Sequence, residues 1–117
     1  MSVGVITDMS HLISIYNENK NEYDEDIDNW NISNVKSMDY MFFGAKLFNQ
    51  SLNQWDVSNV KNMSHMFYWA VSFNQSLNSW DVSSVKNMDY MFNNATLEMF
   101  YKAISFDMNN ALWYNEK

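Results

Sequence analysis

The stretch FNQSLNSWDVSSVKNMDYMFNNATL, at positions 73–97, repeats the 25 residues that precede it, FNQSLNQWDVSNVKNMSHMFYWAVS at positions 48–72. The two stretches are identical at 17 of 25 positions, without a gap. A period of this length indicates an architecture in which one short structural unit is stacked several times. Columns of identical residues extend the period to a third copy: Trp30, Trp55 and Trp80; Val35, Val60 and Val85; Met38, Met63 and Met88; Met41, Met66 and Met91; Phe42, Phe67 and Phe92; Ala45, Ala70 and Ala95.

The repeats predict a single domain over residues 1–117. A degraded copy precedes the full ones, because Ile6–Leu12 matches Val60–Met66 in pattern. Terminal copies diverge in such arrays, since they must cover a core that no further copy buries. Five of the 14 acidic residues fall in one short insertion, which we expect to be a solvated loop. The predicted parts are a degenerate N-terminal coil at 1–22 with an acidic loop at 16–26, repeats at 23–47, 48–72 and 73–97, and a C-terminal cap at 98–117.

Within one copy, the apolar spacing predicts a strand followed by a helix. Leu52, Trp55 and Val57 have the L-x-x-L-x-L spacing of leucine-rich repeats, and a strand would turn them inward. Apolar residues then recur at i, i+3, i+6, i+7 and i+10 from Val60 to Ala70, which is one face of a helix. The predicted fold class is therefore an α/β repeat. It is a short right-handed leucine-rich-repeat-like solenoid, with one short parallel strand and one short helix per 25-residue coil.

The composition excludes several classes of partner and location. The chain has 14 acidic and 7 basic residues, all seven of them lysine, and a net charge of -7, which disfavours binding to nucleic acid. No apolar run approaches the roughly 20 residues of a membrane helix, so we expect no membrane insertion. The first residues contain no basic segment followed by an apolar stretch, so we expect no signal peptide and a cytoplasmic or virion location.

The residues that carry most enzyme chemistry are absent or isolated. There is no cysteine, and two glycines cannot form a glycine-rich phosphate loop. His11 and His65 occupy equivalent positions beside methionines, without a neighbouring acid or serine that would suggest catalysis or metal binding. Asp56 and Asp81 form a column, but any residue in a repeat does so, and no third ligand accompanies them. We therefore predict a protein that is not an enzyme and has no metal or cofactor.

The aromatic residues indicate both a core and a candidate interface. The tryptophan column is expected to fill the core, because large aromatic side chains dominate core energetics. Trp69 breaks the pattern, since Gly44 and Asn94 occupy the same place in the other copies. An unmatched aromatic at such a position is typical of a contact surface. Phe43 and Tyr68 stand beside it in register, so Phe43, Tyr68 and Trp69 are predicted to form an exposed aromatic patch.

Further candidate interface residues come from the predicted strand and from the tail. The strand face would present a polar, mildly acidic surface to a partner, and Trp113 in the tail could remain exposed for one. These further candidates are Gln54, Asp56, Ser58, Ser79, Asp81, Ser83 and Trp113.

The run from Phe73 to Met88, followed by Met91, Phe92 and Ala95, resembles the repeats of BspA-like leucine-rich repeat surface proteins. Their pattern is F-N-Q-x-L-x-x-W-D-V-S-x-V-x-x-M-x-x-M-F-x-x-A. The resemblance implies adhesion or binding to host proteins, and a family that is often found on cell surfaces. It brings no common catalytic residues.

The sequence thus favours a non-enzymatic protein–protein interaction module with a protein partner. One alternative is a structural or assembly protein, such as a virion component, which forms a homo-oligomer through an open end of the array. A weaker alternative is a carbohydrate-binding module that uses the tryptophan column, since stacked indole rings bind sugars when they are exposed.

Overall fold

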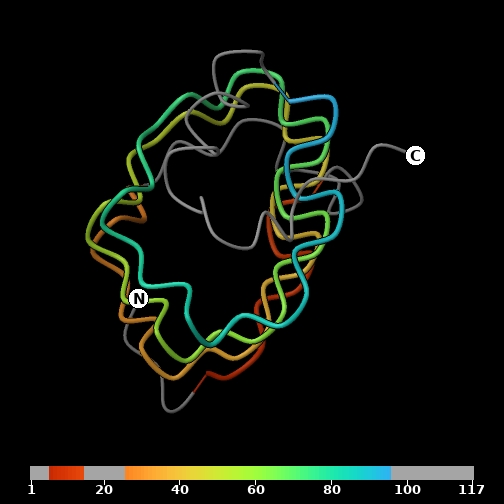
Figure 1. Cartoon of the computed structure of the whole chain (residues 1–117). Helices are drawn as coiled ribbons and strands as arrows, with labels where there is room; N and C mark the ends of the chain where they lie inside the picture. The colour runs from red at the N-terminus through yellow and green to blue at the C-terminus, as the bar shows by residue number, and fades with distance from the viewer. Residues whose placement is uncertain (1–5, 15–25, 96–117) are drawn as a thin grey trace.

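The chain winds into coils that lie one on another. The computed structural model describes residues 6–14 and 26–95. In Figure 1, successive turns of the chain follow nearly the same closed path, so that residues one repeat apart lie side by side. We refer to the described segments as coil 1 (6–14), coil 2 (26–47), coil 3 (48–72) and coil 4 (73–95).

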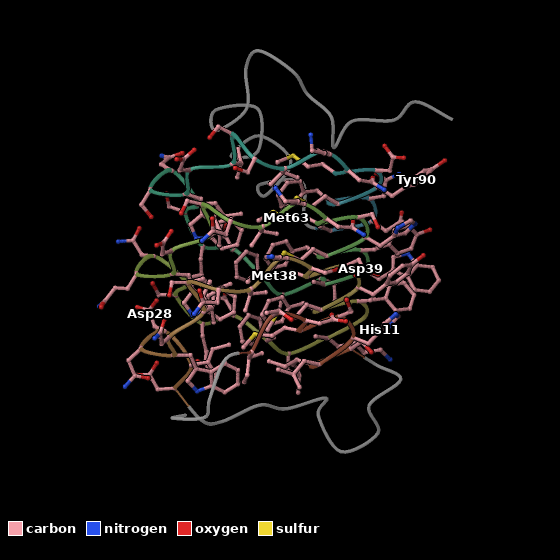
Figure 2. All side chains as sticks on the ribbon, turned by 90° about the horizontal axis from the view of Figure 1, so that it is seen from below. His11, Asp28, Met38, Asp39, Met63 and Tyr90 are labelled. Carbon is pink, nitrogen blue, oxygen red and sulfur yellow. The ribbon has the colours of Figure 1, made fainter. Side chains whose placement is uncertain are left out.

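Backbone hydrogen bonds join each coil to the next along one side. Asp8, Ser37, Asn62 and Asn87 are linked in that order by isolated parallel β-bridges. Beyond each bridge, alternate N–H groups donate to the following coil, as Met38 does to the carbonyl of Asn62 at 2.9 Å. Figure 2 shows the coils edge-on, with Met38 and Met63 in successive layers. This ladder continues from coil 2 to coil 3 through Tyr40 to Ser64, Phe42 to Met66 and Gly44 to Tyr68.

The remaining N–H groups close turns within each coil. Met41 donates to the carbonyl of Met38 at 3.2 Å, and Ala45 donates to that of Phe42 at 3.0 Å. The third residue of each of these turns has a positive φ, 60° at Tyr40 and 68° at Gly44, as a type II turn requires. The backbone therefore alternates between a bond to the next coil and a bond within its own turn.

The predicted fold class, an α/β solenoid with a strand and a helix in each coil, is wrong. Over residues 6–14 and 26–95 the structure contains no helix and no strand longer than a single bridge. The predicted helix fails because His65 and Trp69 have φ values of 57° and 59°, which a right-handed helix excludes. The same apolar spacing is produced by turns that return to the core every three or four residues.

The predicted strand fails because its residues are also bent into turns. The N–H of Trp55 donates to the carbonyl of Leu52 at 3.2 Å, a bond that an extended chain cannot make. Asp56 then accepts hydrogen bonds from both the N–H and the hydroxyl of Ser58, at 3.0 and 2.6 Å. Such Asx turns bend the chain locally, and this explains how coils free of proline can turn so often.

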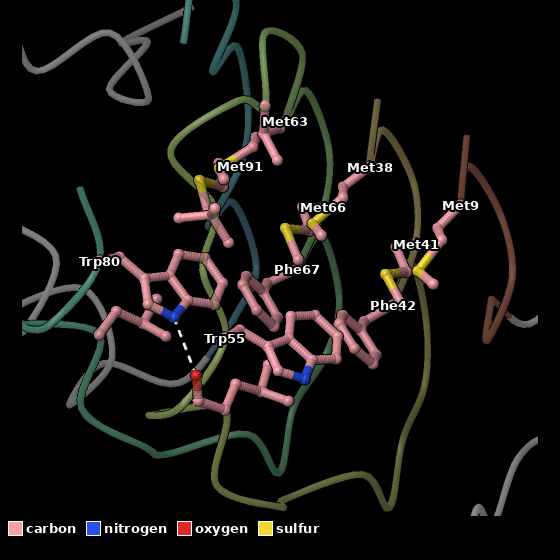
Figure 3. Close-up of a cluster of buried hydrophobic side chains, with 14 of the residues drawn as sticks. Met9, Met38, Met41, Phe42, Trp55, Met63, Met66, Phe67, Trp80 and Met91 are labelled. Atoms are coloured by element: carbon pink, nitrogen blue, oxygen red, sulfur yellow. Dashed lines mark hydrogen bonds between the residues drawn. The ribbon is translucent and has the colours of Figure 1, made fainter. Parts of the chain in front are cut away.

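The repeated apolar columns form the core, as the sequence predicts. Trp30, Trp55 and Trp80 are buried, with 7, 3 and 5% of their surface exposed. Their indole rings are therefore not available to a sugar. Figure 3 shows the methionines and phenylalanines of successive coils packed in parallel rows beside Trp55 and Trp80. Phe67 lies at the centre of one row, with ring centroids 5.3 Å from Phe42 and 5.7 Å from Phe92.

Side chains add further bonds between coils. The indole N–H of Trp55 donates to the carbonyl of Ile27, and that of Trp80 to the carbonyl of Leu52, both at 2.9 Å. The second of these bonds is the dashed line in Figure 3. Because the donor and acceptor recur together in the repeat, coils 2 and 3 each anchor a tryptophan from the coil above.

Two parts of the predicted organisation fall outside the structure. The acidic loop, apart from Asp26, and the C-terminal cap with Trp113 lie outside the described residues. Within the described segments, no helix has the length and hydropathy needed to cross a bilayer.

Candidate functional site: an aromatic edge

Four residues with positive φ place their rings in one column at the edge of the stack. Tyr40 stacks on His11 with ring centroids 4.8 Å apart, and on His65 at 4.5 Å, nearly parallel in both cases. His65 in turn lies 5.1 Å from Tyr90. All four have φ between 57° and 63°, so the left-handed backbone at this repeat position turns each ring outward. We call His11, Tyr40, His65 and Tyr90 the ring column.

The predicted aromatic patch, Phe43, Tyr68 and Trp69, lies beside the ring column. Phe43 has its ring centroid 5.4 Å from Tyr68 and 6.3 Å from Trp69, and the last two rings are 5.5 Å apart. Phe43 also contacts Tyr40 edge-on at 5.5 Å. The ladder explains this proximity, because Gly44 donates to the carbonyl of Tyr68 and so brings coils 2 and 3 into register. The structure thus brings these three side chains together into one surface.

Trp69 is the most unusual member of this surface. Its φ is 59°, in the left-handed region that disfavours side chains with a Cβ, yet half of its surface (50%) is exposed. Gly44 and Asn94, at the same repeat position, have φ values of 68° and 59°, which glycine and asparagine accept readily. A tryptophan is therefore held where the backbone favours a small residue, and with half of the residue's surface exposed.

The electrostatic environment of the ring column is set by carboxylates. Burial lowers the pKa of His65, while the charges of Asp89 and Asp39 oppose that effect in part. The buried Nδ1 of His65 has no hydrogen-bond partner among the described residues, so no partner there stabilises the charged imidazolium. At neutral pH His65 is accordingly an uncharged ring between two tyrosines, with acidic groups close by.

This depressed pKa predicts a pH-dependent stability. The unfolded chain takes up a proton at His65 more readily than the native state, so stability falls as pH drops below the ordinary value of 6.5. His65→Tyr should reduce that loss, because Tyr40 and Tyr90 already occupy the same position with φ near 60°. Thermal denaturation of both proteins between neutral and mildly acidic pH measures the difference. An unchanged slope in the variant would show that His65 does not contribute to it.

A comparison with known proteins places the chain in a family. Residues 7–117 match the family described as Mycoplasma protein of unknown function, DUF285. The chain belongs to the DUF285 family. Neither the curated proteins nor the solved structures contain a match to it.

In this DUF285 chain the predicted polar surface does not lie on a strand. Asp56 and Asp81 each accept bonds from the serine two residues later, and these bonds lower the pKa of both carboxyls. The hydroxyl of Ser79 donates to the carbonyl of Asn53 in the coil below, at 2.8 Å. These bonds close turns and join coils, while Asp56, Ser79 and Asp81 remain exposed.

That polar region is separate from the ring column and the aromatic patch, which we together call the aromatic edge. The N–H of Gln54 donates to Asp28 at 3.0 Å, and Figure 2 shows Asp28 on the opposite side of the stack from His11, Asp39 and Tyr90. Trp113 lies outside the described residues. No group of three or more residues that could hold a metal ion is found within the described segments of this DUF285 chain.

Sequence reasoning missed the ring column, although the signal was present. Tyr40, His65 and Tyr90 stand 25 residues apart, and the match of Ile6–Leu12 to Val60–Met66 adds His11. An aromatic ring therefore occupies this position in every copy of the DUF285 chain. A search for identical residues 25 positions apart does not find this column, because histidine and tyrosine alternate in it. A search for aromatic rings of either type would find it.

Proposed function

We propose that the chain is a non-enzymatic protein–protein interaction module that contacts its partner through the aromatic patch. Trp69 is the observation that carries this proposal. A non-glycine residue in the left-handed region costs about 1 to 2 kcal/mol. Trp69 bears that cost while 50% of its surface stays exposed, so its own fold leaves half of the side chain's contact surface unused.

The composition of the surrounding surface supports the same function. Aromatic residues are enriched at the centres of protein interfaces, where they supply much of the binding energy. Val71, two residues after Trp69 in coil 3, is 51% exposed. Leu47 in coil 2, which corresponds to Ser72 in coil 3, is 57% exposed. Both residues follow patch residues within two to four positions of the sequence, and exposed apolar residues are typical of a binding surface.

The likeness of the repeats to BspA-like leucine-rich repeat proteins also supports this proposal. The chain belongs to the DUF285 family. That its 25-residue pattern is a BspA-like leucine-rich repeat is part of this proposal. Adhesion and host-protein binding, which that resemblance implies, both require a surface that recognises another protein.

Replacing Trp69 by glycine tests the proposal without destroying the fold. We expect Trp69→Gly to change the free energy of unfolding by no more than about 1 kcal/mol, because relief of the left-handed backbone offsets the lost ring contacts. The same variant should lose the capture of a partner from a lysate of the cell that expresses the protein. Urea denaturation and affinity capture measure the two effects.

Asn94→Gly is the matched control. Asn94 has the same φ and the same repeat position as Trp69, but it presents no ring to the patch. This variant should capture the partner as the unmodified protein does. Capture that survives Trp69→Gly, or that is lost equally in both variants, contradicts the proposed interface.

A further inference from the structure

We propose that the aromatic edge recognises a basic, arginine-containing segment of its partner protein. This inference rests on the proposed function and adds the chemistry of the partner to it. Two features carry the inference: the half-exposed ring of Trp69, which can receive a planar cation, and the carboxylates close to the ring column, which can pair with positive charge on the same segment.

Two carboxylates lie close to the ring column. Asp39 and Asp89 immediately precede Tyr40 and Tyr90 in the sequence, and both act electrostatically on His65. The backbone ladder fixes their place, because the N–H of His65 donates to the carbonyl of Asp89 at 2.9 Å. Figure 2 shows Asp39 on the same side of the stack as His11 and Tyr90. A ligand that covers these rings therefore meets negative charge.

The two carboxylates differ in the hydrogen bonds that they already accept. Asp39 accepts hydrogen bonds from the hydroxyls of Ser10 and Ser37. Asp89 is exposed, and its carboxylate accepts no hydrogen bond from any of the described residues. Asp89 therefore has its full acceptor capacity available to a cation from outside.

The lysines occupy other positions of the repeat than the rings do. Lys36, Lys61 and Lys86 form an exposed column four residues before the ring positions, at the start of the ladder. The charges that act on His65 are those of Asp89 and Asp39. Lys46, which follows the turns of coil 2, is the nearest basic residue after the patch in the sequence. The environment of His65 is thus aromatic and acidic, while Lys46 stands in coil 2 at the position that corresponds to Val71.

Arginine fits this surface better than other side chains do. A guanidinium group is planar and weakly hydrated, stacks on aromatic faces and pairs with a carboxylate. Trp69 offers the best such face, since indole binds cations more strongly than other aromatic rings. A second copy of the chain is a poor occupant, because it contains no arginine and carries a net charge of -7.

The experiment uses a fluorescein-labelled peptide of alternating arginine and glycine, whose binding to the full chain is followed by fluorescence anisotropy. Two reference peptides replace every arginine by glutamine or by glutamate. We expect the arginine peptide to bind and the glutamate peptide not to bind. Raising the ionic strength from about 0.01 M to about 1 M shortens the Debye length about tenfold and should weaken the arginine complex.

Variants locate the complex on the surface. Trp69→Gly should weaken binding of the arginine peptide by about two- to fivefold, the size of one exposed cation–π contact. Asp89→Asn should weaken it by about twofold or more, as expected for an exposed ion pair. Asp28→Asn removes the same charge on the opposite side of the stack and should leave binding nearly unchanged.

The outcomes separate this inference from the function on which it rests. Equal binding of the glutamine peptide, or equal losses in Asp89→Asn and Asp28→Asn, overturns the preference for a basic segment. Absence of arginine-peptide binding overturns it as well. The capture experiment with Trp69→Gly and Asn94→Gly then decides independently whether the patch binds a protein of another kind.

Discussion

Phe67→Ala is expected to lower the free energy of unfolding by about 3 to 5 kcal/mol, the range found when a buried phenylalanine is truncated to alanine. Phe67 is fully buried and contacts Phe42, Phe73 and Phe92, with the nearest ring centroid 4.3 Å away at Phe73. Its removal would leave a cavity that three coils share. Because small domains have only about 5 to 15 kcal/mol of stability in total, the variant should be close to unfolding.

Phe43→Ala provides the comparison for this prediction. Phe43 is half-buried at the surface, one residue along the chain from the core residue Phe42. Its truncation should cost about 1 kcal/mol, roughly the value of its surface ring contacts. Urea denaturation of both variants measures the difference. Similar losses of stability for Phe43→Ala and Phe67→Ala would mean that the phenylalanine row is not the centre of the core.

Tyr40→Pro is expected to destabilise the stack by about 3 kcal/mol or more, the order of cost when proline removes a needed backbone N–H and cannot adopt the required φ. The N–H of Tyr40 donates to the carbonyl of Ser64 at 2.9 Å, and its φ is 60°. Proline supplies neither, since its ring fixes φ near -65°. The ladder between coils 2 and 3 would lose a bond in its middle.

Tyr40→Gly separates the two causes. Glycine keeps the N–H and accepts a positive φ, so the loss should be limited to the ring contacts with His11 and His65. Circular dichroism during thermal denaturation should rank the proteins as wild type, then glycine, then proline. A glycine variant as unstable as the proline variant would assign the effect to the ring column and not to the backbone.

The contents of the core could be predicted from the sequence, because a buried column must be apolar in every copy. The repetition of Trp55 and Trp80, and of Met63 and Met88, specifies which side chains face inward. Neither residue type needs a helix or a strand to do so. Inward position is therefore a property of the 25-residue period itself.

The backbone conformation could not be predicted in this way. The spacing of apolar residues from Val60 to Ala70 fits one face of a helix. It fits equally well a series of turns that bring a side chain back to the core every three or four residues. The choice between them depends on where the N–H groups find acceptors. In this fold every second N–H group, such as those of Met63 and His65, donates to a carbonyl of the next coil. The apolar pattern of a single segment contains no information about such an acceptor.

Part of the candidate site could be predicted from the 25-residue period. The period places Phe43 and Trp69 in neighbouring coils at nearly the same position, and their rings therefore come together. The polar positions predicted from a strand, such as Gln54 and Asp56, do alternate with the buried Trp55 and Val57, although turns and not a strand place them there. Asp56 also accepts a hydrogen bond from the hydroxyl of Ser58, and a single-strand pattern does not predict that bond.

The ladder between coils has a further consequence for the electric field of the molecule. From Met9 to Ile13, from Met38 to Gly44 and from Met63 to Trp69, the N–H groups of the ladder point toward the later coil, while bonds in the opposite sense occur around the lysine positions. The peptide dipoles of the ladder are therefore aligned, and they add along the stack as they do along a helix. Its coil 4 end carries a partial positive charge and its coil 1 end a partial negative charge. Two coils of identical sequence thus stand at different electrostatic potentials, according to their distance from each end.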